Sequence, residues 1–270
     1  MSSASRRPRP RKRLAVIAAC VALASLAAAT PSGAELVERG DLFVRFSGGI
    51  APTALPRDRL APIAVRVKGT VKTLSGSKPP ALRWISLEIN RGGQIDTRGL
   101  PVCHRSQVEA TSSRGALSAC RSALVGEGRY VAGTAFPEQA SFPSRGRIVA
   151  FNSVEEGRPA ILAHVYGTMP VPTTRIFFFR IHHRQGTFGT TLTASLPPSI
   201  NRYGYLKQIS LALFRVYRFR GRVHSYLSAA CSAPVGFAGA VFPFARAAMA
   251  FEDGRKLAST LTRSCHVAGG

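Results

Sequence analysis

The chain has 270 residues and carries 37 lysine and arginine residues against 13 acidic ones, a formal net charge of +24 at pH 7. A surplus of this size attracts anions such as nucleic acid, anionic lipid or wall polymers. The basic residues are spread along the chain, and no stretch after the N-terminal region holds five like charges in a row. This distribution excludes a basic tail. Only 6 of the 37 basic residues are lysine, so an arginine-rich coding bias is the alternative explanation of the charge.

The first 34 residues are predicted to be a signal peptide. Six basic residues precede an apolar run of 16 residues over 14–29, which is short for a membrane span of roughly 20 residues. Ser32 and Ala34 supply the small residues that a signal peptidase reads, so we expect cleavage after Ala34. Cleavage would leave 31 basic and 13 acidic residues, a net charge of +18, in a secreted or cell-envelope protein. An uncleaved membrane anchor is the alternative.

From residue 35 onward, short runs of alternating apolar residues between Gly, Pro, Asn and Asp predict β-strands. No segment keeps a helical pattern for three turns, and only 107–120 is weakly helical. Many short strands with turns between them predict an all-β fold, an antiparallel β-sandwich. The expected strands cover 42–46, 63–72, 82–89, 129–134, 147–151, 159–166, 174–182, 187–196, 206–219, 222–227, 238–242, 245–251 and 255–262.

Two of these strands carry the same phrase. Leu82–Ile89 and Leu206–Leu213 share a leucine, a basic residue, an isoleucine, a serine and a second leucine at the same spacing. We therefore predict an internal duplication with two related halves, 35–170 and 171–270, either as tandem domains or as one pseudo-symmetric sandwich. The alternative is that similar short strand sequences arise by chance because of the amino-acid composition. Further matches keep the same order: 42–46 with 177–181, 120–126 with 231–236, and 150–158 with 250–255.

Four cysteines follow the signal segment, and an even number in an exported chain predicts disulfide bonds. Of the three possible pairings, we favour Cys103–Cys120 and Cys231–Cys265, one in each half. Loops of this size would each contribute roughly 3 kcal/mol of stability if the bonds are unstrained. We expect no metal or cofactor site, because no C-x-x-C pair exists and the histidines lack metal-ligand spacing.

The strongest surface candidate is the segment 215–224. On a strand, Arg218, Arg220 and Arg222 would form a cationic face opposite Tyr217 and Phe219. Arginines interleaved with aromatic residues can hold anionic polymers, and Arg215 would extend the set. The alternative is an ordinary strand with its aromatic residues in the core and its arginines in water.

A hydrolase would need acidic and basic groups that converge on one substrate. Glu88 and Glu127 lie in or beside expected strands, and His164 and His224 are the histidines that could join them. None has a visible partner in the sequence, and no serine-nucleophile motif stands in a suitable context. The sequence therefore favours a non-enzymatic role.

Five short segments are distinctive when taken together: Gly99–Cys103, Cys120–Gly126, Ala160–Gly167, Tyr226–Ser228 before Cys231, and Leu261–Cys265. With these segments the chain resembles a family of uncharacterised exported proteins of high-GC bacteria. The resemblance covers most of the chain after the signal segment and implies export but no particular activity.

Taken together, these observations predict a non-enzymatic binding or structural protein of the cell envelope or the extracellular space. The first alternative is a polyanion binder that uses the basic segment around Arg220, with anionic envelope polymers, anionic lipid or nucleic acid as the partner. The second alternative is an extracellular hydrolase.

Overall fold

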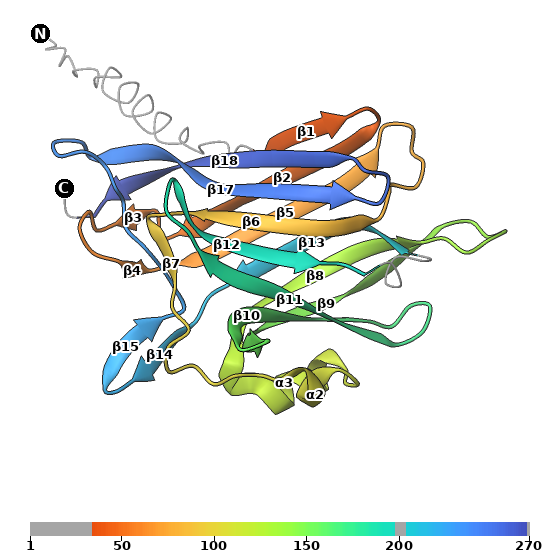
Figure 1. The fold of residues 1–270 in the computed structure, drawn as a ribbon, viewed down its shortest axis with the longest axis horizontal. Helices are drawn as coiled ribbons and strands as arrows, with labels where there is room; N and C mark the ends of the chain where they lie inside the picture. The colour runs from red at the N-terminus through yellow and green to blue at the C-terminus, as the bar shows by residue number, and fades with distance from the viewer. Residues whose placement is uncertain (1–33, 198–203, 269–270) are drawn as a thin grey trace, which may run out of the picture. The chain divides into compact units, whose positions relative to one another are not determined.

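The computed structural model describes residues 34–197 and 204–268, and its fold is all-β with antiparallel strands, as the strand pattern predicts (Figure 1). The few helical turns are α2 (Arg105–Val108), α3 (Ser113–Cys120) and η1 (Arg121–Ala123). The strands are β1 (Glu35–Arg39), β2 (Leu42–Ala51), β3 (Ala54–Leu55), β4 (Ala61–Pro62), β5 (Ala64–Thr73), β6 (Leu82–Asn90), β7 (Gly93–Ile95), β8 (Leu124–Thr134), β9 (Phe142–Glu155), β10 (Arg158–Gly167), β11 (Thr173–His183), β12 (Phe188–Ser195), β13 (Gly204–Leu213), β14 (Val216–Phe219), β15 (Arg222–Ser225), β16 (Leu227–Ala229), β17 (Gly239–Phe251) and β18 (Lys256–Val267).

One large sheet takes thirteen of the described strands. Their order is β1-β2-β5-β13-β8-β9-β10-β11-β12-β6-β17-β18-β3, and all neighbours are antiparallel except β18 and β3. Two small sheets, β14-β15 and β4-β16-β7, complete the fold. Neighbours in the large sheet are often far apart in the sequence, so its order depends on long-range pairing.

The two strands with the shared phrase lie in exchanged positions. β6 pairs with β12 and β17, whereas β13 pairs with β5 and β8. Each strand therefore lies among strands from the other predicted half. Residues 35–170 and 171–270 share one sheet and do not form separate domains in the described part of the chain.

Part of the strand order in the large sheet occurs twice, once around β13 and once around β6. The series β2-β5-β13-β8 corresponds to the series β11-β12-β6-β17, with β6 and β13 as the third member of each. The match between 150–158 and 250–255 does not follow this order. Gly157 turns the chain from β9 to β10, whereas Gly254 turns it one strand earlier, from β17 to β18. The internal duplication stays a prediction.

Alternation along the strands separates the core from the surface. Leu42, Val44 and Phe46 on β2 are buried, while the residues between them face outward. β9 and β10 instead contain continuous apolar runs, because both of their faces are covered. Their outer face packs against α2 and α3, with Val149, Phe151 and Leu162 in contact with Val108 and Ala116 and their neighbours.

Both predicted disulfide bonds are confirmed. Cys103, just before α2, is bonded to Cys120 at the end of α3, so the bond closes the helical cap over β9 and β10. Cys231, after β16, is bonded to Cys265 on β18. All four cysteines are buried, and each bond ties a segment without regular structure, at Cys103 or Cys231, to a helix or strand.

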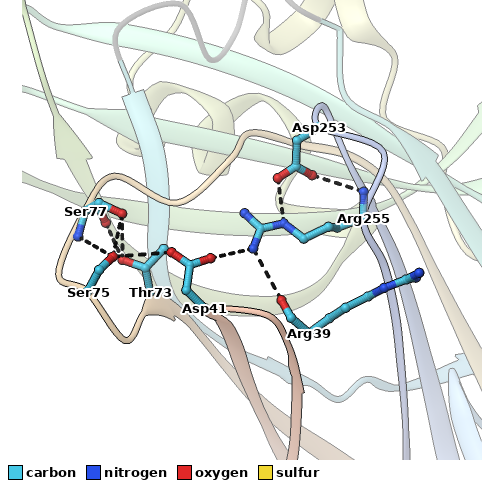
Figure 2. A network of polar contacts seen from close by, with 7 residues as sticks. All are labelled: Arg39, Asp41, Thr73, Ser75, Ser77, Asp253 and Arg255. Carbon is cyan, nitrogen blue, oxygen red and sulfur yellow. Dashed lines mark hydrogen bonds and ion pairs between the residues drawn. The ribbon is translucent and has the colours of Figure 1, made fainter.

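The large sheet curls until β18 meets β1 and β2. Arg255 Nη1 donates to Asp41 Oδ1 at 2.7 Å and to the Arg39 carbonyl at 3.3 Å, and its Nε donates to Asp253 Oδ2 at 2.6 Å (Figure 2). The Arg255 guanidinium holds the pKa of Asp41 below its usual range. Farther along β18, Arg263 Nε donates to the Gly48 carbonyl on β2 at 2.6 Å. These contacts join distant members of the strand order.

Close packing of β8 against β13 yields a stability prediction. A Cβ atom at Gly128 would overlap the Ser210 carbonyl oxygen, which belongs to the sheet backbone and cannot move aside. We predict that Gly128→Ala lowers the free energy of unfolding by about 1–3 kcal/mol, as overpacking does elsewhere. Urea denaturation of the purified protein measures this loss.

Gly49→Ala on β2 is the matched control, because the nearest atom to its added Cβ would be 3.9 Å away. We expect the control to change the free energy of unfolding by no more than about 0.5 kcal/mol. Equal losses in the two variants would contradict a close approach of β8 to β13.

Candidate anion-binding surface

The segment 215–224 forms a hairpin, so the predicted single cationic strand face is wrong. β14 ends at Phe219, Arg220 and Gly221 make the turn, and β15 begins at Arg222. The two turn residues have φ values of 49° and 75°, as a tight two-residue hairpin turn requires. Arg218 pairs with Val223, and Phe219 pairs with Arg222, so Arg218 and Arg222 lie on opposite faces. The three exposed arginines, 218, 220 and 222, still gather around the tip of the hairpin.

The fourth predicted member lies apart from the tip. Arg215 precedes β14 and is only partly exposed, and its Nη2 donates to the Ser122 carbonyl at 3.3 Å. Its contacts are therefore with the body of the protein. The structure brings together three of the four predicted arginines, and anion binding by them stays a prediction.

One face of the hairpin is fixed to the segment that follows β7. Tyr217 and His224 stack with ring centroids 5.7 Å apart, and the Tyr217 hydroxyl donates to the Arg98 carbonyl at 2.6 Å. Asp96 pairs with Arg98 at 2.8 Å and lies 3.6 Å from His224 Nδ1. The Arg98 guanidinium beside Asp96 holds the pKa of this carboxyl below its usual range. These contacts leave the opposite face of the hairpin free to meet solvent.

A larger cationic surface, which no pattern in the sequence predicted, lies on the large sheet. We call it the basic face: the outward side of β2, β5, β13, β8 and β9. On each of these strands the alternate residues, such as Val44 and Val71, turn toward the core. The basic face carries seven basic side chains: Arg45, Arg66, Lys68, Lys72, Arg129, Arg145 and Arg147.

Strand register places these cations in rows across the sheet, because residues paired across antiparallel strands share a face. In one row Ser47 is opposite Lys68, Lys68 is opposite Ser210, Ser210 is opposite Arg129, and Arg129 is opposite Arg147. With strands about 4.8 Å apart, this row spans about 19 Å. The side chains of the two serines are short, so they leave room for a long ligand to lie along the row.

The charges on the basic face are poorly balanced. Arg129 and Arg147 stand directly opposite one another, an arrangement that destabilises a sheet. Glu127 offsets part of this repulsion by accepting a hydrogen bond from Arg147 Nη2 at 2.8 Å. Lys72 lies 4.8 Å from the centroid of the Phe43 ring. Within the described residues, no ion pair is formed by the other five: Arg45, Arg66, Lys68, Arg129 and Arg145.

The four candidates for acid–base catalysis have separate partners. Glu88 lies 3.7 Å from Arg246, Glu127 pairs with Arg147, and His224 lies beside Asp96. His164 is buried beneath the helical cap, with Nε2 3.1 Å from the Thr111 carbonyl oxygen. These contacts hold no two of the four as a hydrogen-bonded or ion pair, so the hydrolase hypothesis gains no acid–base pair from them.

A cleft of about 440 Å³ lies beside α2 and over β11 and β12. Arg180 in this cleft is paired with Glu155 at 2.8 Å and with Glu156 at 3.1 Å. Arg105 places its guanidinium 5.2 Å from the Phe178 ring centroid. Because acidic residues offset part of its charge, the cleft is a weaker candidate for anions than the basic face.

Residues 34–197 and 204–268 contain no candidate metal site and no candidate membrane-spanning helix. No group of three or more His, Cys, Asp and Glu side chains in these ranges could hold a metal ion. No helix in them has the length and apolar character needed to cross a membrane. Comparisons with protein families, with characterised proteins and with solved structures found no match to this chain. Function is therefore inferred from the surfaces of the chain itself.

His164 yields a prediction about pH. Burial lowers the pKa of this imidazole, and its Nδ1 has no hydrogen-bond partner among the described residues. The unfolded chain takes up the proton near pH 6.5, whereas the folded chain stays neutral until a lower pH. We therefore predict that the free energy of unfolding is greatest above pH 6.5 and falls as the pH decreases below it.

Chemical denaturation at a series of pH values measures this loss. In His164→Gln, the amide group replaces the imidazole N–H donor but cannot titrate. We expect the free energy of unfolding of this variant to change less between pH 7 and pH 5. His266→Gln removes an exposed histidine and should follow the wild-type profile. A wild-type profile that His164→Gln leaves unchanged would contradict the assignment.

Proposed function

We propose that this chain is an exported, non-enzymatic binding protein that holds a linear anionic polymer on its basic face. The observation that carries the proposal is the gathering of seven basic side chains on one outward side of five adjacent strands. A cationic surface of this kind raises the local concentration of anions and contacts them directly.

The arrangement of the cations favours a polymer over a small anion. Lys68 and Arg147 lie at two ends of a row that crosses β5, β13, β8 and β9, and Arg66 and Lys72 extend the charge along β5. One small anion would contact only one or two of these side chains. A chain of repeated phosphates or carboxylates would contact several at once, and each contact would add to its affinity.

The cost of the arrangement supports a role in binding. Like charges directly opposite on a sheet lower its stability, and Arg129 and Arg147 hold this position with only Glu127 beside them. A surface that served stability alone would place acidic residues between these strands. Features that lower stability without a structural benefit are expected at functional surfaces.

Export is supported by two lines of reasoning. The N-terminal segment has the order of a signal peptide, a basic region before an apolar run and a small-residue cleavage site. The two buried disulfide bonds favour an oxidising compartment, because thiols stay reduced in the cytosol. The polymer that such a protein meets is an anionic component of the cell envelope.

The test compares two triple variants that remove the same charge. Arg45→Gln, Lys68→Gln and Arg129→Gln together neutralise the basic face, and linear polyphosphate is the probe. Isothermal titration across a series of salt concentrations measures affinity. Because each phosphate contact contributes to the salt dependence, we expect the slope of log affinity against log salt to fall by about 2 in this variant.

The control variant carries Arg218→Gln, Arg220→Gln and Arg222→Gln, which lie on the separate β14-β15 hairpin. We expect it to keep the wild-type salt slope and an affinity within about twofold of wild type. Equal losses in both variants would show a response to net charge alone and would overturn the proposal, as would wild-type protein that does not bind polyphosphate.

A further inference from the structure

The β14-β15 hairpin presents an apolar surface that no other part of the described chain covers. It forms a two-stranded sheet of its own, drawn at the lower left of Figure 1 apart from the large sheet. Val216 and Val223 are 58% and 63% exposed, and Phe214, just before the hairpin, is 52% exposed. Large apolar side chains that gather at the surface mark sites of interaction.

The outer face of the hairpin combines Val216 and Val223 with a cation. Arg218 pairs with Val223, and Val216 lies two residues earlier on β14, so all three share one face. The other face carries Tyr217 and His224, which pack toward Asp96 and the Arg98 carbonyl. Because this second face of the hairpin packs against the rest of the protein, the face with Val216, Arg218 and Val223 points outward.

The tip of the hairpin is cationic and has no acidic partner. Arg218, Arg220 and Arg222 form no ion pair with any described residue. The Arg220 guanidinium lies 5.2 Å from the Phe219 ring centroid, which orients it without neutralising its charge. The tight turn at Arg220 and Gly221 keeps the three cations within one short loop.

We propose that this hairpin docks the protein onto the surface of a membrane that contains anionic lipids. Val216 and Val223 contact the boundary between headgroups and acyl chains, and the arginines at the tip bind lipid phosphates. Guanidinium groups suit this role, because they bind phosphate oxygens through paired hydrogen bonds. Amphipathic elements with basic residues bind membrane interfaces through the same combination of burial and charge.

The apolar groups distinguish a bilayer from a soluble polymer. A soluble polyanion would pair with the arginines but would leave Val216 and Val223 in water. A bilayer surface accepts both kinds of side chain, so it matches the whole outer face of the hairpin. This surface is separate from the basic face, and the docking proposal does not depend on polymer binding.

The hairpin also lies at one end of the basic face. β13, the middle strand of that face, leads directly into β14 through residues 214 and 215. Its last residue, Leu213, pairs with Val65 at the start of β5, so the hairpin lies near that end of the sheet.

Co-sedimentation of the purified protein with lipid vesicles tests the inference. One set of vesicles contains equal parts phosphatidylglycerol and phosphatidylcholine, and the other contains phosphatidylcholine alone. We expect binding to the anionic vesicles and roughly a hundredfold weaker binding after Arg218→Gln, Arg220→Gln and Arg222→Gln together. Val223→Ser should weaken binding several-fold without a change of charge, because it removes only apolar contact.

Two matched controls distinguish docking through the hairpin from nonspecific adsorption to vesicles. Leu74→Ser changes a side chain that is also 63% exposed but lies beyond the opposite end of β5, and it should leave binding unchanged. The triple variant of the basic face should also bind anionic vesicles as wild type does. Non-reducing peptide mapping confirms that each variant keeps both disulfide bonds.

The inference is overturned if the hairpin triple variant binds vesicles as tightly as wild type, or if Val223→Ser and Leu74→Ser have equal effects. It is also overturned if neutralising the basic face abolishes vesicle binding, because the lipids would then bind there. Loss of polymer binding with retained vesicle binding, or the reverse, tells the two proposals apart.

Discussion

The insertion of β13 between β5 and β8 is the constraint on which the rest of this structure depends. β13 pairs with residues 65–70 on one side and with residues 126–134 on the other, so it joins segments that are far apart in the sequence. Without it, β5 and β8 would not belong to one continuous surface. Gly126 and Gly128 permit this pairing, because side chains there would overlap backbone carbonyl oxygens of β13. The exchanged position of β6 between β12 and β17 completes the same sheet.

This sheet order decides where the charge of the protein gathers. The inward residues of β2 and β5 form a core that is closed where Arg255 and Arg263 bring β18 against the first strands. The outward residues of β2, β5, β8 and β9 are then left on one side, and many are basic. The hairpin that follows β13 adds a second cationic surface with a different, apolar character. Two anionic partners of different chemistry, a polymer and a lipid surface, fit these two surfaces.

Local strand alternation in the sequence was sufficient to predict the all-β class, because short segments display it directly. The cysteine count predicted disulfide bonds but allowed three pairings, and the confirmed pairs were chosen by assigning one bond to each half of the chain. The expected strand bounds 206–219 and 222–227 already left Arg220 and Gly221 between two strands. The surface prediction nevertheless treated 215–224 as one strand, because Arg220-Gly221 lacks the Asn-Gly or Asp-Gly signal of a tight hairpin. The basic face was missed although Arg66, Lys68 and Lys72 alternate with apolar residues in the sequence. Its assembly requires pairing between strands that are not consecutive, and no single segment records that pairing.

Differential acetylation of lysines, with and without linear polyphosphate, tests the central claim most directly. Lys68 and Lys72 lie on the basic face, whereas Lys78 and Lys256 are exposed elsewhere and serve as internal references. The account predicts that polyphosphate protects Lys68 and Lys72 from acetylation while Lys78 and Lys256 react as before. Equal protection of all four lysines, or protection of the two references alone, would contradict a polymer site on the basic face.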